Sequence, residues 1–223
     1  MNAETKQIYI ELTKLITTKG LTPSLAAMLL CVALSASNHP HGIPIVVNKY
    51  LQQIETVQDQ VKWIEYTRNA IVKSSVLSGI PRAINSQTAM YNSLPELYQS
   101  LLRKSPTLNQ TENYWESRGS KLLRAVYGEE YDNADYILNN ASSDLWGWIE
   151  QAYGNVFAET TYLGYIETEL DVIVTLVQMN TLPQLKNHLK GAIRVGATEE
   201  QVKAALLIAH TVRDAFFLNK SRL

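Results

Sequence analysis

Glu169 and His188 are polar residues at positions where the helical pattern of the sequence expects apolar ones. Apolar residues recur at three and four spacing over 163–179 and again over 182–195, so both stretches predict helices with an inward face. Glu169 falls on the first inward face and His188 on the second. A buried carboxylate needs a partner, and a carboxylate and an imidazole in contact shift each other's proton affinities, as general acid/base catalysis requires. The other interpretation is packing, in which a backbone partner or a helix dipole satisfies each group.

Capping residues indicate where these helices begin and end. Thr181 is predicted to cap the helix that carries His188, and Gln184 three residues later would complete a capping box. Gly196 predicts a left-handed stop to that helix. Thr198 with Gln201 forms a second capping box that opens the next helix. The chain is therefore predicted to fold back on itself twice in this region.

Composition argues against several classes of partner. The 20 basic and 21 acidic residues are spread along the 223-residue chain, which predicts neither a nucleic-acid nor a membrane-surface partner. The longest apolar run, 24–36, falls short of the roughly 20 residues that a membrane-spanning helix needs. Cys31 is the single cysteine, so no intramolecular disulfide can form.

The last three residues predict a cellular address. Ser221, Arg222 and Leu223 match the peroxisomal S-K-L tripeptide except that arginine replaces lysine and keeps the positive charge. We therefore expect import into the peroxisome matrix, with the import receptor as a partner.

Residues 167–209 resemble the carboxymuconolactone decarboxylase and alkylhydroperoxidase D-like (AhpD-like) family. The shared pattern is a glutamate followed by leucine, then a histidine, a Gly-Ala pair, the run Gly-Ala-Thr-Glu-Glu and a helix of small residues. The resemblance covers the second half of the chain well and the first half faintly. It implies an all-helical fold that assembles as rings, often trimers or hexamers, so a homo-oligomer is expected. Shorter stretches add to it at 78–84, 126–132 and 148–164.

The family's site residues carry over only in part. In the peroxidase branch, a glutamate, a Cys-x-x-Cys pair and a histidine form a proton relay around a redox dithiol. Glu169 matches the glutamate and His188 the histidine, while the two cysteine positions fall on Thr181 and Gln184. The chain thus resembles a peroxisomal, fungal-type member that lacks the Cys-x-x-Cys, and a dithiol peroxidase mechanism is not expected. The decarboxylase branch needs no cysteine and acts on a carboxylated lactone from aromatic catabolism.

Three hypotheses follow for function. The first is a decarboxylase-like enzyme, a lyase, in which Glu169 and His188 act as the acid/base pair on a small carboxylated or carbonyl substrate. The alternative is a non-catalytic, oligomeric binding or scaffold protein of the peroxisome matrix, in which the pair is a leftover hydrogen bond. A thiol peroxidase that works through Cys31 alone ranks last.

Other polar residues are weaker candidates. His210 ranks below the histidine of the pair, and His39 and His41 read as a loop because no third metal ligand is in view. No metal and no cofactor is therefore predicted. Five further side chains could line a pocket, although surface or packing roles are expected more often: Arg194, Arg213, Tyr153, Trp146 and Trp148.

The whole chain shows helical periodicity and predicts an all-α fold. We expect one AhpD-like domain, 1–223, with weak halves 1–103 and 121–223 that contain a duplicated helical unit. The polar stretch 103–121 is the best candidate for a joint between them. The predicted helices are 4–18, 23–37, 43–54, 58–78, 81–103, 111–126, 131–152, 163–179, 182–195 and 199–218.

Overall fold

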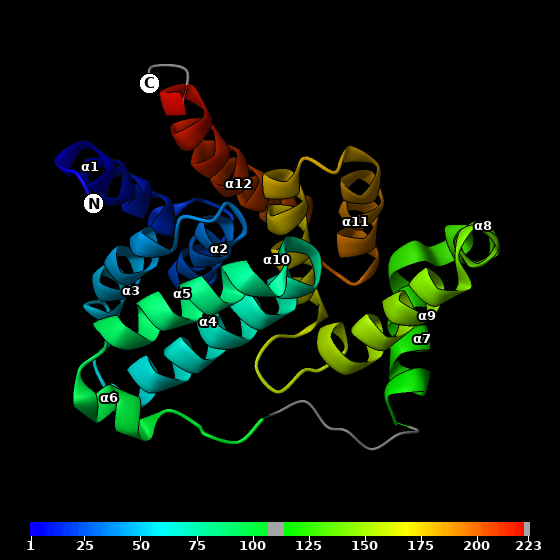
Figure 1. The fold of residues 1–223 in the computed structure, drawn as a ribbon, viewed down its shortest axis with the longest axis horizontal. Helices are drawn as coiled ribbons and strands as arrows, with labels where there is room; N and C mark the ends of the chain where they lie inside the picture. The colour runs from blue at the N-terminus through cyan, green and yellow to red at the C-terminus, as the bar shows by residue number, and fades with distance from the viewer. Residues whose placement is uncertain (107–113, 221–223) are drawn as a thin grey trace.

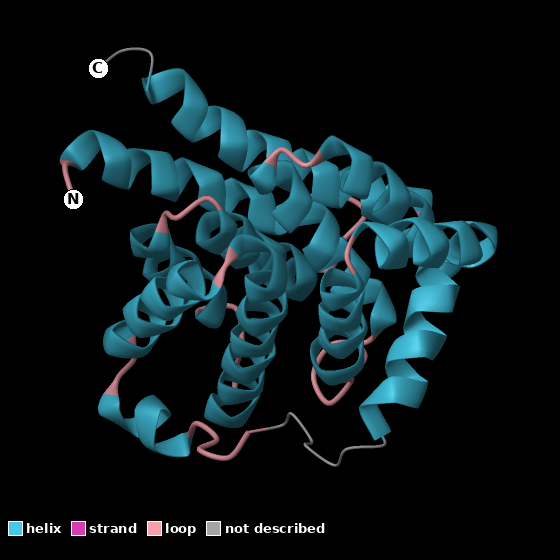
Figure 2. Ribbon diagram, turned by 45° about the vertical axis from the view of Figure 1, so that its right-hand side comes forward, coloured by secondary structure: helices cyan, strands magenta, loops and turns pink. Residues whose placement is uncertain are grey.

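The computed structural model describes the backbone of residues 1–106 and 114–220, and the side chains of 1–106 and 117–216. Over these ranges the chain is all helical, as predicted, and contains no strand (Figure 2). In chain order the α-helices are α1 (Ala3–Leu12), α2 (Pro23–Ala36), α3 (Ile43–Leu51), α4 (Val57–Ser78), α5 (Ile80–Ser93), α6 (Glu96–Leu101), α7 (Tyr114–Tyr127), α8 (Tyr131–Ala141), α9 (Ser143–Ala152), α10 (Tyr165–Met179), α11 (Leu182–Arg194) and α12 (Glu199–Lys220). A π-helical turn, Tyr153–Phe157, extends α9.

The predicted helices 81–103 and 131–152 are each broken into two. Pro95 cannot donate a backbone hydrogen bond and disfavours helical dihedrals in the residue before it, so Leu94 is extended (ψ 142°) and α5 ends. Ser142 is also extended (φ −167°), and its side chain accepts a hydrogen bond from the backbone N–H of Leu145 at 3.2 Å. That serine is an N-cap, which starts α9 afresh.

Helices α2 and α10 form the centre of the molecule. Every residue of α2 from Leu25 to Ala36 is buried, and so is every residue of α10 from Thr168 to Val177. These two helices pack against each other and against α4 and α12. Helices from both predicted halves therefore share one hydrophobic core, as Figure 1 shows where α10 lies among helices from the two ends of the chain. The duplicated unit stays a prediction, and part of the predicted joint, 107–113, lies outside the described residues.

A smaller group of helices stands beside this core. Helices α7, α8 and α9 and the π-helical turn pack together, and α11 lies between this group and α10 (Figure 1). Helix α11 contacts α10 on one side and α7 on the other. A side chain on α11 can therefore meet partners from both groups.

One of the two predicted capping boxes is present. Gln201 donates its backbone N–H to the Thr198 hydroxyl at 3.1 Å, and the Gln201 side chain accepts from the backbone N–H of Thr198 at 2.9 Å. Gly196 adopts the predicted left-handed conformation (φ +107°). The capping role of Thr181 was predicted wrongly. Asn180 ends α10 in a left-handed conformation, and the Thr181 hydroxyl then points back to the carbonyl of Leu176 at 3.4 Å.

No helix of the described residues has both the length and the apolar character needed to cross a membrane.

Candidate functional site

Glu169 and His188 are in contact, as their positions on the two helical faces predicted. Glu169 Oε2 on α10 lies 2.9 Å from His188 Nδ1 on α11. Both residues are buried, with 2% and 5% of their surface exposed. The sequence predicted that α10 has one buried face. The structure shows that all sides of α10 are buried, because the helix packs against α2, α4, α11 and α12.

A hydrogen-bonded chain continues from the other side of the imidazole. His188 Nε2 lies 3.4 Å from the phenol oxygen of Tyr153, and the Tyr153 hydroxyl in turn interacts with the side chain of Tyr127. Tyr153 is buried, whereas Tyr127 at the end of α7 is half-buried. The four side chains of Glu169, His188, Tyr153 and Tyr127, here called the relay, therefore run from the core toward the surface.

The phenols of the relay hold their protons. Burial raises the pKa of Tyr153 well above its usual value, and the neighbouring Tyr127 and Glu169 raise it further. Burial also raises the pKa of Tyr127. Near neutral pH both hydroxyls are therefore donors, and they can pass a proton only by accepting another in the same step.

Gly191 lets α7 and α11 approach closely enough to enclose the relay. A Cβ atom at Gly191 would lie 2.6 Å from Val126 Cγ1 and 3.0 Å from Glu169 Oε2. Such distances are too short for any side chain at this position. The absence of a side chain at Gly191 thus allows the carboxylate of Glu169 to sit against the His188 helix.

A second buried polar cluster ties together the elements that carry the relay. Lys73 on α4 is 1% exposed and donates to the carbonyls of Phe157 (3.0 Å) and Glu159 (2.6 Å) and to the Thr168 hydroxyl (2.8 Å). Phe157 ends the π-helical turn that begins with Tyr153, and Thr168 precedes Glu169 on α10. The Lys73 ammonium thus fixes the turn and α10 relative to each other.

Burial sets the proton affinities of this cluster. It lowers the pKa of Lys73 to about 8, although the negative charges of Asp171 and Glu159 oppose the shift. Burial also raises the pKa of Asp171 well above its usual value, against the opposing effects of Lys73 and a hydrogen bond from Thr175. The cluster was missed at the sequence level. A signal was available, since Lys73 is the lone charged residue between Arg68 and Arg82.

Of the five residues that were predicted as possible pocket-lining residues, two lie at the relay and three lie elsewhere. Tyr153 joins the relay, and Arg194 lies at its outer end, where Nη1 donates to the carbonyls of Val126 and Tyr127, each at 2.8 Å. The other three lie elsewhere: Trp146 is buried against Tyr131, Trp148 is 59% exposed, and Arg213 pairs with the neighbouring Asp214.

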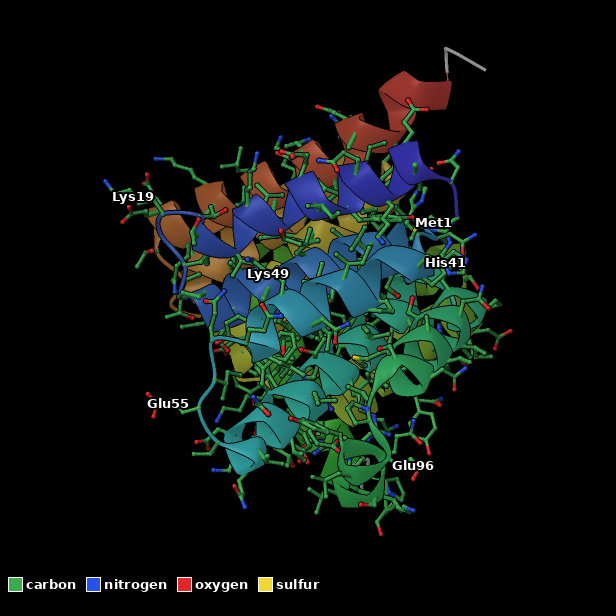
Figure 3. All side chains as sticks on the ribbon, turned by 90° about the vertical axis from the view of Figure 1, so that its left-hand side faces the viewer. Met1, Lys19, His41, Lys49, Glu55 and Glu96 are labelled. Atoms are coloured by element: carbon green, nitrogen blue, oxygen red, sulfur yellow. The ribbon has the colours of Figure 1, made fainter. Side chains whose placement is uncertain are left out.

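The remaining histidines and the cysteine lie apart from the relay. His39 stacks on Phe216, and His41 lies at the surface beside Met1 (Figure 3). Among the described residues no group of histidine, cysteine and acidic side chains is arranged to hold a metal ion. His210 is half-buried. Cys31 is fully buried in α2, and burial raises the pKa of its thiol, which opposes thiolate formation.

The predicted targeting residues Ser221, Arg222 and Leu223 lie outside the described residues.

Fold and site together define an all-helical protein with a carboxylate, an imidazole and two phenols linked in its interior. The chain is 30% identical over 191 residues to peroxisomal protein 2 of Schizosaccharomyces pombe, covering 85% of each protein. It is also 30% identical over 182 residues to peroxisomal protein 2 of Saccharomyces cerevisiae, covering 71% of this chain and 64% of that relative. The chain belongs to the peroxisomal protein 2 family and is a peroxisomal protein. No family model and no solved structure matches it.

Proposed function

We propose that this peroxisomal protein carries out acid/base chemistry on a small carboxylated or carbonyl compound, in the manner of the carboxymuconolactone decarboxylase branch of the AhpD-like proteins. The observation that carries the proposal is the contact of 2.9 Å between Glu169 Oε2 and His188 Nδ1, continued through Tyr153 to Tyr127. A carboxylate that orients an imidazole and shares its Nδ1 proton leaves Nε2 to take up or return a proton. The half-buried Tyr127 is the end of the relay that a substrate reaches.

In a decarboxylation, the bond between the carboxyl carbon and the adjacent carbon breaks, CO2 leaves, and the electron pair stays on that adjacent carbon. The relay supplies the proton that this carbon needs. His188 enters the step as the imidazolium, with its charge balanced by Glu169; Tyr127 donates outward, Tyr153 reprotonates Tyr127, and His188 Nε2 reprotonates Tyr153. Arg194 lies beside Tyr127, and its half-buried guanidinium suits the substrate carboxylate. Solvent then restores the proton that leaves the relay.

The test uses the purified full-length chain and a panel of γ-lactones that carry a carboxyl group. Release of CO2 and uptake of deuterium from D2O are followed by NMR. We expect His188→Ala to lower the rate at least about 100-fold, the typical contribution of a positioned acid or base. His210→Ala on the neighbouring helix is the matched control and should keep the activity. A His188→Ala protein as active as the parent would sink the proposal.

Burial of the pair favours a second candidate, a non-catalytic oligomeric binding or scaffold protein of the peroxisome matrix. With 2% and 5% exposure, Glu169 and His188 meet no substrate directly, and a buried, satisfied pair also specifies packing. This candidate predicts no turnover of any lactone in the panel by the parent protein. It also predicts that His188→Ala changes thermal stability alone.

We further propose that Ser221, Arg222 and Leu223 bind the peroxisomal import receptor and deliver the chain to the matrix. A fluorescent protein fused to the N-terminus reports the location in cells. We expect Arg222→Lys to keep the fusion in peroxisomes and Arg222→Glu to release it into the cytosol. Peroxisomal location of the Arg222→Glu protein would show that another signal directs import.

A further inference from the structure

A small pocket lies on the far side of α4 from the centre of the core and shares no residue with the relay. Its volume is about 180 Å³. One face of α4 supplies Glu65, Arg68, Asn69 and Val72, which follow the three and four spacing of a single helical face. Helix α5 supplies Gln87, and the segment after α6 supplies Arg103 and Pro106.

The charges that line this pocket leave an excess of one positive charge. Glu65 is 5% exposed, and its Oε1 accepts from Arg68 Nη1 at 2.8 Å and from the backbone N–H of Arg103 at 2.7 Å. Arg103 Nε lies 4.0 Å from the other carboxylate oxygen, and its guanidinium lies 5.6 Å from the ring centre of Tyr162. Two guanidinium groups therefore face one carboxylate, and a bound monoanion would balance them.

Two polar groups in the lining have no hydrogen-bond partner in the part of the chain that the structure describes. Asn69 is 7% exposed, and its Oδ1 atom accepts no hydrogen bond from the described residues. The Nε atom of Arg103 is buried and has no hydrogen-bond acceptor over the ranges 1–106 and 117–216. Buried polar groups in native proteins usually have a partner, so a molecule bound at this site, a water or a small ligand, would satisfy both groups. Asn69 Oδ1 is an acceptor and Arg103 Nε is a donor, so the bound molecule must both donate and accept a hydrogen bond.

We propose that this pocket binds a short hydroxy-carboxylate, with the carboxylate on Arg68 and Arg103 and the hydroxyl donated to Asn69. The net charge of the lining selects a monoanion, and guanidinium groups favour a planar carboxylate. Val72 and Pro106 supply apolar surface for a short hydrocarbon chain. The volume equals that of roughly six water molecules, which limits the ligand to a few non-hydrogen atoms.

The test is calorimetric titration of the purified full-length chain with lactate, propanoate and inorganic phosphate. Lactate and propanoate differ by the one hydroxyl, and phosphate is a small anion without an apolar part. We expect lactate to bind about tenfold more tightly than propanoate, the gain typical of a satisfied buried acceptor. Phosphate should bind more weakly than either, because it offers nothing to Val72 and Pro106 and because its dianion carries more charge than the lining balances.

Variants separate the two recognition elements. Arg68→Gln should weaken lactate and propanoate binding about tenfold or more. Asn69→Leu should lower lactate affinity to that of propanoate and leave propanoate unchanged. Arg213→Gln is the matched control, because Arg213 is similarly half-exposed and also pairs with a nearby carboxylate, yet lies on α12.

Four results would overturn the proposal. They are the absence of lactate binding, equal binding of lactate and propanoate, tighter binding of phosphate than of both acids, and unchanged lactate affinity in Arg68→Gln. Thermal melts identify any variant that does not fold. If Arg68→Gln unfolds, the Asn69→Leu comparison decides, since it alters one neutral group.

Discussion

Replacing Lys73 by methionine tests whether a buried ammonium holds the π-helical turn against α10. Methionine matches the length of lysine and has a similar helix propensity, so the change removes the charge and little else. The carbonyls of Phe157 and Glu159 would lose their donor, at 3.0 and 2.6 Å. Removing one partner from a buried charged cluster is strongly destabilising, and we expect the free energy of unfolding near pH 7 to fall by about 3 kcal/mol.

The pH dependence provides a sharper signature than the loss itself. The folded-state pKa of Lys73 is about 8, below the value of about 10.4 for an unfolded lysine. Below pH 8 Lys73 is protonated in both the folded and the unfolded chain. Above pH 8 Lys73 loses its proton in the folded chain but keeps it in the unfolded chain. Stability conferred at this site therefore rises with pH between these values, by about 1.4 kcal/mol per pH unit. The methionine variant lacks this gain.

Other buried groups also titrate in this range. Burial raises the pKa of the Cys31 thiol, so the unfolded chain loses that proton first and stability falls as pH rises above about 8.5. This effect is common to the parent and the variant and cancels in their difference. The difference in the free energy of unfolding is therefore expected to grow by about 2 kcal/mol between pH 7.5 and 9.5.

Urea denaturation followed by circular dichroism at several pH values measures this difference. Lys62→Met is the matched control on the same helix, because the Lys62 side chain is 77% exposed and pairs with Asp59 at the surface. It should change stability by less than about 1 kcal/mol, with little dependence on pH. A Lys73→Met difference that stays constant from pH 7.5 to 9.5 would refute the pKa argument. A loss no larger than that of Lys62→Met would refute the structural role.

Three further predictions concern single positions. Gly191→Ala should destabilise the protein by about 1–3 kcal/mol in urea denaturation, because the new methyl group would meet a valine of α7 at 2.6 Å, whereas Gly147→Ala on α9, with no atom within 4 Å, should not destabilise it. Thr198→Ala should cost about 1 kcal/mol through its capping bond, and a loss as large in Thr181→Ala, which has no such bond, would contradict the capping assignment. Cys31 should not react with a thiol reagent in the folded protein and should react once per chain in urea, and fast reaction in native buffer would disprove its burial.

The sequence alone determined what depends on local spacing. The inward positions of Glu169 and His188 followed from helical periodicity, and their contact followed from the expectation that consecutive helices pack together. The second capping box was equally readable, because Thr198 and Gln201 lie within one turn. The all-helical class needed no more than this periodicity.

The tertiary structure decided what depends on distant segments. Lys73 and Glu159 are 86 residues apart, and Tyr153 and His188 are 35 apart. A periodic pattern shows which face of a helix turns inward, but it does not show which side chains oppose that face. The place of Tyr127 in the relay and the link that Lys73 makes between α4 and α10 therefore depend on how the helices pack. For the same reason Arg103, after α6, and Arg68, on α4, came together at the pocket only in three dimensions.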